Sequence, residues 1–148
     1  MSRTLNTMKT LLELALIELD TAAKHLAKAN QQVIDAKVQQ EQLASYRDEY
    51  LSRNQLMMGS GMGVSELINT RNFIKNLDLA VNGQNQIIEN YANIAKNYLS
   101  VWQACQSKKR SYEILIEREM AKLNRIELKK EQKMMDEFSS NQKRFLLG

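Results

Sequence analysis

The chain has 148 residues, a formal net charge of +4, no proline and only five glycines. Proline and glycine are the residues that most disfavour helices, so their scarcity leaves long stretches without a stop signal. Aromatic residues make up 6% of the chain, which is too few for a typical α/β core, and no run of β-branched residues predicts a strand. These properties indicate an all-α protein.

Two features of the sequence indicate the cellular compartment of the protein. Cys105 is the only cysteine, so no disulfide can form within the chain, and the reducing cytosol is the expected setting. The first twenty residues are too short and too charged for a membrane span, and they lack the small-residue cleavage site of an exported protein. We therefore expect a soluble, unexported protein that does not insert into the membrane.

The basic charge belongs to one end of the chain. From Lys108 to Gly148 there are eleven Lys and Arg residues against seven Asp and Glu, and the preceding residues sum to zero. An acidic partner would therefore bind the C-terminal part.

A heptad pattern predicts the first helix. Alternate steps of three and four from Leu5 reach twelve positions, of which eleven are apolar: Leu5, Met8, Leu12, Ala15, Leu19, Ala22, Leu26, Ala29, Val33, Ala36, Gln40 and Leu43. Five unbroken heptads are strong evidence for a coiled-coil seam.

The second helix has two apolar rows side by side. One steps from Phe73 through Leu77, Ala80, Gln84, Ile87, Tyr91, Ile94, Tyr98, Val101, Cys105, Lys108, Tyr112 and Leu115, and the other contains Ile74, Val81, Ile88, Ala95, Trp102 and Ile116. The phase then shifts toward Met120, Leu123 and Ile126, which predicts a heptad stutter.

A glycine cluster separates the two helices. Gly59, Gly61 and Gly63 fall within five positions, and such a cluster disfavours helix while permitting positive φ. We predict one domain, residues 1–148, with helix 1 at about 3–54, a bend at about 55–66, helix 2 at about 67–140 and a frayed C-terminus. The expected fold is an antiparallel coiled-coil hairpin with a longer second helix, in which residue i lies near residue 122 − i and about thirty C-terminal residues overhang.

Catalytic and cofactor motifs are missing from the sequence. His25 is the only histidine, so it cannot begin a zinc site, and we expect it to be a solvated helix residue. The Gly59–Gly63 segment lacks the Gly-Lys-Ser/Thr continuation and the preceding strand of a phosphate loop. We expect no enzymatic activity, no cofactor and no metal.

An aromatic cluster near the bend exceeds what a hairpin requires. After Leu43, both Tyr46 and Tyr50 are expected to depart from the Leu5 register, which would continue to Arg47 instead of Tyr46. The pairing rule places both tyrosines beside Phe73 and Leu77. The cluster is either a local core at the end of the hairpin or an exposed docking face, because two apolar rows exceed what a two-stranded coil can bury.

Two further segments are candidates for interaction. The apolar residues of Leu11–Leu19 point nearly all round the helix, which is typical of a helix enclosed by several neighbours. Self-association and insertion into a larger assembly both explain this distribution. The segment Glu131–Phe138 lies on the basic overhang, where a solvated charged face is the simplest interpretation.

Five motifs in this order resemble the FliJ family, the small coiled-coil component of the flagellar type III export apparatus. They are Leu43-x-x-Tyr-Arg-x-Glu-Tyr50, the glycine-rich bend, Asn72-Phe-Ile-x-x-Leu-x-x-Ala80 with Gln84, Trp102, and Glu131-Gln-Lys-x-x-Asp-Glu137. The resemblance runs from near the N-terminus to about Phe138.

The resemblance implies a function that periodicity does not supply. Members of the family resemble the stalk of rotary ATPases: they enter the hexameric export ATPase, promote its assembly, contact the cytoplasmic domain of the membrane export gate and escort export chaperones. It implies a cytoplasmic protein peripherally associated with the inner face of the cell membrane at the flagellar base. The implied gate-binding residues are Leu43, Tyr46, Tyr50, Phe73, Leu77, Ala80 and Gln84. The implied contacts with the ATPase ring are Leu12, Leu16, Leu19, Glu131, Gln132, Lys133, Asp136 and Glu137.

Two other functions are considered. A generic homodimeric coiled-coil scaffold fits the heptads. A nucleic-acid-binding hairpin would use the basic excess for phosphate contacts, but acidic residues are interspersed among the basic ones and no basic–aromatic stripe is present. We therefore expect no nucleic-acid partner.

Overall fold

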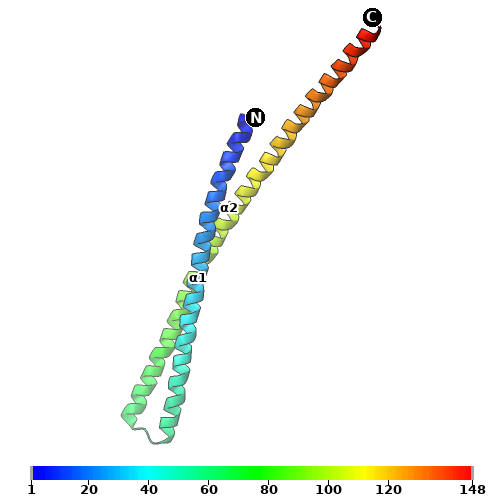
Figure 1. Cartoon of the computed structure of the whole chain (residues 1–148). Coiled ribbons are helices and arrows are strands. Elements are labelled where there is room, and N and C mark those ends of the chain that lie inside the picture. The colour runs from blue at the N-terminus through cyan, green and yellow to red at the C-terminus, as the bar shows by residue number, and fades with distance from the viewer. Residues whose placement is uncertain (1, 148) are drawn as a thin grey trace. The chain divides into compact units, whose positions relative to one another are not determined.

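A computed structural model describes residues 2–147, in which two helices account for nearly every residue. Helix α1 is Arg3–Gly59 and helix α2 is Val64–Leu147. They run in opposite directions from a short turn, and Figure 1 shows the cyan part of α1 beside the green part of α2. No strand occurs between residues 2 and 147. The predicted all-α antiparallel hairpin with a longer second helix is therefore confirmed.

The chain divides into two compact units, each containing a part of both helices. Unit 1 consists of Met1–Asp20 and Ala104–Gly148, and unit 2 is the continuous segment Thr21–Gln103. Unit 2 contains the turn and the aromatic cluster, whereas unit 1 contains the apolar N-terminal segment and the basic C-terminal segment.

The predicted heptad positions of α1 are the ones that it buries. All twelve positions from Leu5 to Leu43 are buried or half-buried. The smallest exposed fractions belong to four alanines spaced seven residues apart: Ala15 (2%), Ala22 (5%), Ala29 (3%) and Ala36 (3%). Because alanine has no side chain beyond Cβ, these layers let the helices approach closely. The same spacing continues through Arg47, Tyr50 and Asn54. Tyr46 therefore lies outside the seam as predicted, but the predicted departure of Tyr50 is wrong, because three residues beyond Arg47 the register reaches Tyr50.

The seam of α2 follows neither of the two predicted apolar rows alone. Half of the Phe73 row faces away from the seam, namely Phe73, Ala80, Ile87, Ile94, Val101, Lys108 and Leu115, all of which are exposed. The seam combines the other half of that row with the second row, including Leu77, Gln84, Ala95 and Ile116. The two rows are both apolar and share a repeat, so only packing against α1 distinguishes them. The predicted stutter is also wrong, because the spacing continues unbroken through Ile116, Glu119 and Leu123.

The turn is shorter than the expected bend. Only residues 60–63 lie between the helices, where we expected a bend of about twelve residues. Gly61 has φ of +93°, in the region that favours glycine. The amide of Ser60 donates to the carbonyl of Met57 at 3.2 Å, and the amide of Leu67 donates to that of Gly63 at 3.0 Å. Gln, Leu and Met are good helix formers, which explains why residues 55–58 remain helical. At the other end, α2 continues to Leu147 rather than ending near residue 140.

Cross-helix contacts follow the expected pairing to within about one helical turn. In unit 2, Arg47 contacts Asp78 where the rule gives residue 75, and His25 stacks on Tyr98 where it gives residue 97. In unit 1, Glu18 pairs with Lys108 where the rule gives residue 104.

Candidate functional site

Three aromatic rings meet beside the turn in unit 2. The rings of Tyr50 and Phe73 have centroids 4.5 Å apart and are tilted by 51°. Tyr46 meets the same Phe73 ring edge-on, at 6.5 Å and 78°. Rings in such arrangements attract each other beyond the area that they bury. Two residues of α1 and one of α2 therefore form a preorganised aromatic cluster.

Exposure divides the predicted gate-binding residues into two groups. Tyr46 is 47% exposed and Phe73 is 38% exposed, Ala80 is also exposed, and Leu43 and Tyr50 are half-buried. Leu77 and Gln84, at 9% and 8% exposure, belong to the core. The predicted surface is thus partly core and partly exposed: Leu77 and Gln84 are buried, whereas Tyr46 and Phe73 are accessible to solvent.

Gln84 is fixed in place by hydrogen bonds to α1. Its Nε2 donates to the backbone carbonyl of Ala36 at 3.0 Å and to Oε1 of Gln39 at 3.3 Å. A buried amide with partners costs little, whereas an unsatisfied one costs several-fold more. Gln39, with Gln42, Leu43, Tyr46 and Gln84, also lines an open hollow beside the cluster. Gln39 is exposed, and its position seven residues before Tyr46 puts it on the same flank of α1.

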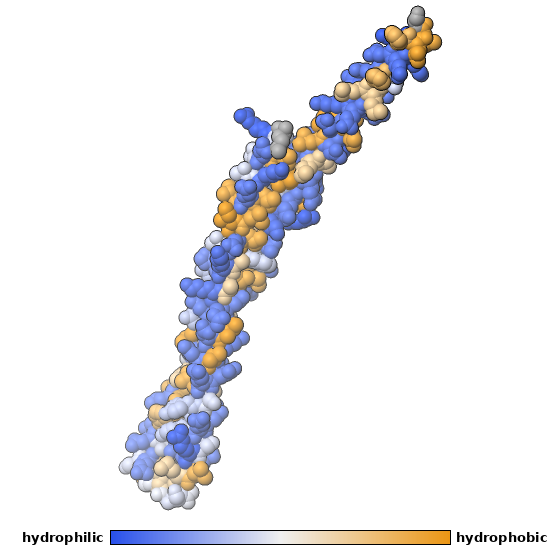
Figure 2. Space-filling view, in the orientation of Figure 1, coloured by the Kyte–Doolittle hydropathy of each residue, from blue (hydrophilic) through white to orange (hydrophobic). Residues whose placement is uncertain are grey.

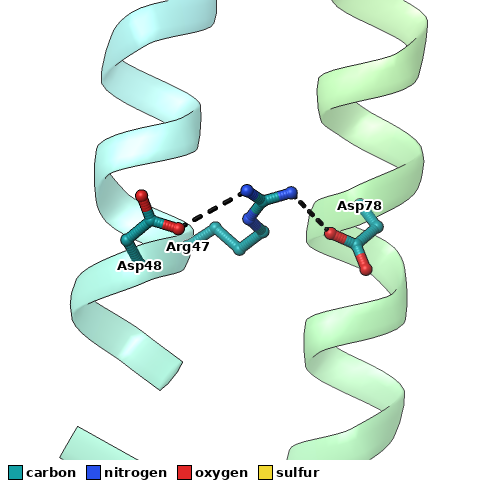
Figure 3. Close-up of polar contacts among 3 residues, drawn as sticks. All are labelled: Arg47, Asp48 and Asp78. Carbon is teal, nitrogen blue, oxygen red and sulfur yellow. Dashed lines mark hydrogen bonds and ion pairs between the residues drawn. The ribbon is translucent and has the colours of Figure 1, made fainter. Parts of the chain in front are cut away.

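A charged residue occupies the α1 seam directly beside Tyr46. The Arg47 guanidinium donates to Asp78 Oδ1 on α2 at 3.0 Å and contacts Asp48 Oδ1 at 3.4 Å (Figure 3). The hydrogen bond to Asp78 raises the pKa of Arg47 above its ordinary value, and burial opposes this. Nε of Arg47 is buried and makes no hydrogen bond within residues 2–147. The Leu5 register could have identified this residue, because it places an arginine at a position that is otherwise mostly apolar.

Unit 1 exposes aliphatic surface on α1. Leu12 and Leu19 are half-buried at seam positions, whereas Leu16 is 43% exposed. Other aliphatic side chains there are also exposed: Leu11, Leu14 and Ile17. Figure 2 shows apolar surface, in orange, gathered over this N-terminal part of α1. The segment is thus covered by α2 on one side only.

An ion pair between Lys108 and Glu18 joins the two helices in unit 1. Lys108 Nζ lies 3.1 Å from Glu18 Oε2, and this hydrogen bond raises the pKa of Lys108 above its ordinary value. Both side chains are about half exposed, so solvent screens the pair.

The predicted ring-contact residues on the C-terminal part of α2 are all exposed. Glu131, Gln132, Lys133, Asp136 and Glu137 lie on a helical stretch with exposed apolar neighbours, Met134 (69%), Met135 (71%) and Phe138 (69%). The structure does not bring these residues into one cluster with Leu12, Leu16 and Leu19 through any contact that it defines.

No binding role is predicted for His25 or Cys105, but the structure defines the surroundings of both. His25 is exposed, but its ring stacks on Tyr98 with centroids 5.6 Å apart and an angle of 14°, so it is more ordered than a freely solvated side chain. Cys105 is half-buried at a seam position of α2.

Metal-ligating clusters and membrane spans were sought in residues 2–147. In that part of the chain no three His, Cys, Asp or Glu side chains gather as metal ligands. Neither helix, over the same residues, contains a segment apolar enough for its length to cross a membrane.

Comparison with known proteins identifies the family. The family model described as flagellar FliJ protein matches residues 4–144. A flagellar FliJ protein of Salmonella typhi is 28% identical over 132 residues, which cover 89% of this chain and 90% of the relative. One from Escherichia coli strain K12 is 26% identical over the same share of each chain. The match runs through the aromatic cluster, the turn and most of both helices, and the chain therefore belongs to the flagellar FliJ family.

Proposed function

We propose that this protein is a non-enzymatic component of the flagellar type III export apparatus that connects the export ATPase to the membrane export gate. The observation that carries the proposal is the family match over residues 4–144, together with a helical hairpin that exposes different surfaces in its two units. The protein acts in the cytoplasm, at the inner face of the membrane beneath the flagellum.

The aromatic cluster of unit 2 is the proposed surface for the cytoplasmic domain of the gate. Exposed aromatic side chains on a rigid support are typical anchors of protein interfaces. Tyr46 and Phe73 are held in mutual contact while more than a third of each remains accessible. In this proposal Tyr46, Tyr50, Phe73, Ala80 and the edge of Leu43 contact the gate, whereas Leu77 and Gln84 hold the two helices in register beneath them.

Unit 1 supplies the proposed contacts with the hexameric ATPase. The aliphatic side chains of Leu12, Leu16 and Leu19 suit an apolar bearing, since Leu16 and its neighbours remain exposed beside α2. The proposed C-terminal contacts are all exposed and lie within residues 108–148, a segment with net positive charge: Glu131, Gln132, Lys133, Asp136 and Glu137. Such a segment is attracted to an acidic opening of the ring. Insertion promotes ring assembly and couples ATP hydrolysis to export. Escort of export chaperones belongs to the same proposal and rests on the family resemblance.

The test measures ATP hydrolysis and ring assembly of the cognate export ATPase with and without the purified chain. We expect both to rise with the chain present, and Leu16→Ser to reduce the effect. Ile34→Ser is the matched control, because Ile34 is 53% exposed on α1 but lies in unit 2. An ATPase whose rate and assembly stay constant across stoichiometric ratios would rule out the stalk function.

A further inference from the structure

Three open hollows of the same design follow one another along one flank of unit 2. On α1 each is lined by residues i, i+3, i+4 and i+7, and each successive hollow is shifted by seven residues. The first is lined by Gln39, Gln42, Leu43 and Tyr46 with Gln84; the second by Gln32, Asp35, Ala36 and Gln39 with Tyr91; the third by His25, Lys28, Ala29 and Gln32 with Tyr98 and Ile94.

This spacing matches the holes of a coiled coil. In knobs-into-holes packing, a side chain of one helix inserts among four residues of its neighbour, and these holes recur every seven residues. Here α2 contributes Gln84, Tyr91 and Tyr98 to successive hollows, and Ile94 also lines the third. The hollows stay open to solvent, so each can receive a further side chain.

Apolar side chains of the matching spacing stand on the same flank. Ile87, Ile94 and Val101 of α2 are 44%, 42% and 52% exposed and lie seven residues apart. They belong to the half of the Phe73 row that faces away from the seam. Ile94 itself lines the third hollow. The flank therefore carries both hollows and apolar side chains that could fill such hollows, and both recur every seven residues.

We propose that the occupant of this flank is a second copy of the chain, packed with its own flank in a two-fold symmetric, antiparallel arrangement. A two-fold axis requires that a surface be complementary to itself. With the axis near Gln32 and Tyr91, Ile87 and Ile94 of each copy enter hollows of the other, because these two isoleucines lie on either side of Tyr91.

The charges on the flank agree with this symmetry. Lys28 and Asp35 stand at equivalent rim positions of neighbouring hollows, so the two-fold operation sets Lys28 of one copy opposite Asp35 of the other, twice. Gln31 donates to Asp35 Oδ1 at 2.9 Å, which holds the carboxylate at the rim. Between Leu79 and Ser107 the sequence of α2 contains only two charged residues, Glu89 and Lys96. Few charged groups on α2 would therefore lose contact with water when the dimer forms. This favours association, because the desolvation of charged groups is costly.

The first experiment measures the mass of the full chain in reducing buffer, so that Cys105 cannot cross-link it, by sedimentation equilibrium over a wide concentration range. We expect a monomer–dimer equilibrium. Ile94→Gln removes an apolar side chain from both copies and should raise the dissociation constant by about a hundredfold. Ile34→Gln is the matched control, since Ile34 is exposed on α1 but does not line the hollows, and it should leave the constant unchanged. Circular dichroism verifies that each variant remains helical.

The second experiment tests the symmetry itself. Lys28→Asp places two carboxylates opposite each other at both ends of the interface and should weaken the dimer about tenfold. Asp35→Lys should weaken it similarly. The double variant Lys28→Asp/Asp35→Lys restores opposite charges in the two-fold arrangement and should recover the wild-type constant.

Three results would overturn the proposal. One is a chain that stays monomeric at every concentration. Another is a dimer that Ile94→Gln leaves intact, which would place the contact on another face. The third is a double charge variant as weak as the single ones, because the two-fold pairing of Lys28 with Asp35 requires recovery.

Discussion

Arg47 of α1 reaches across the seam to Asp78 of α2, with 3.0 Å between Nη1 and Oδ1. Among the seam positions of α1 from Leu5 to Asn54, Arg47 is the one that carries a charge. The neighbouring residues, Tyr46 on α1 and Leu77 on α2, belong to the aromatic cluster and its support. The ion pair therefore links the two helices beside the aromatic cluster.

Charge reversal at this pair tests its role in register. Arg47→Asp places a carboxylate between Asp48 and Asp78, and we expect the melting temperature to fall by a few degrees. Arg47→Asp/Asp78→Arg restores the attraction across the helices and should recover most of the loss. Thermal unfolding followed by circular dichroism measures both. If the double variant melts no higher than the single one, the pair contributes nothing to the helix pairing.

Within the proposed gate surface, the exposed residues are expected to contact the gate and the buried ones to hold the helices together. Tyr46→Ala removes a side chain that is 47% exposed, so the free energy of unfolding should change by no more than about 1 kcal/mol. Binding to the purified cytoplasmic domain of the gate should weaken by more than about tenfold. Leu79→Ala, at a position that is 60% exposed on α2 outside the cluster, is the control and should affect neither.

Leu77→Ala, unlike Tyr46→Ala, should lower the stability of the fold substantially. Leu77 is 9% exposed, and truncating a buried leucine costs about 2–4 kcal/mol in the free energy of unfolding. Chemical denaturation measures this loss. A Leu77→Ala chain as stable as the wild type would show that Leu77 is not part of the core, and the division of the cluster into contacts and support would be incorrect.

Two glycines should respond to alanine in opposite directions. Gly61 has φ of +93°, where a Cβ is strained, so Gly61→Ala should lower the free energy of unfolding by about 1 kcal/mol. Gly83 lies within α2, and a Cβ built there meets nothing within 4 Å. Gly83→Ala should raise the free energy of unfolding by about 0.5–1 kcal/mol, because alanine favours helix. Urea denaturation of the two variants compares them directly, and a shift in the same direction for both would contradict the assigned geometry of the turn.

The pair between Lys108 and Glu18 predicts a loss of stability in alkali. The folded state raises the pKa of Lys108, so the protonated amine is favoured by folding. Its contribution is complete below the ordinary lysine pKa of about 10.4 and is lost as the pH rises through the higher pKa of the folded state. A double-mutant cycle with Lys108→Gln and Glu18→Gln should give a coupling at neutral pH that disappears in strong alkali. High salt should reduce the coupling as well, because both side chains are about half exposed. A coupling that persists unchanged above the lysine pKa would exclude the ion pair as its source.

The seam of α1 could be predicted from the sequence because its apolar row is unbroken from Leu5 to Ala36, whereas the other apolar residues of this helix form no equally continuous row. The seam of α2 could not, since Phe73 and Ile74 begin two apolar rows of similar quality and only contact with α1 selects between them. The same ambiguity concealed the exposed residues Ile87, Ile94 and Val101. In the candidate site, the sequence grouped Tyr46, Tyr50 and Phe73 correctly near the turn, but exposure depends on which side of the seam each residue occupies. Gln39 and Asp78 were missed because amides and carboxylates on helices usually face solvent, and their partners come from the other helix.

The alanines at positions 15, 22, 29 and 36 have a consequence for recognition. Each replaces a side chain that would otherwise separate the two backbones, so the hairpin is thin where they occur, and it gains little burial energy per heptad. In a thin pair of helices the residues beside the seam lie close to a common plane, and a partner can touch both helices at once. Alanine at these positions thus weakens the pairing of the helices but leaves side chains of both helices accessible from the same side. Such a surface is suited to contacts with other proteins along the sides of the hairpin.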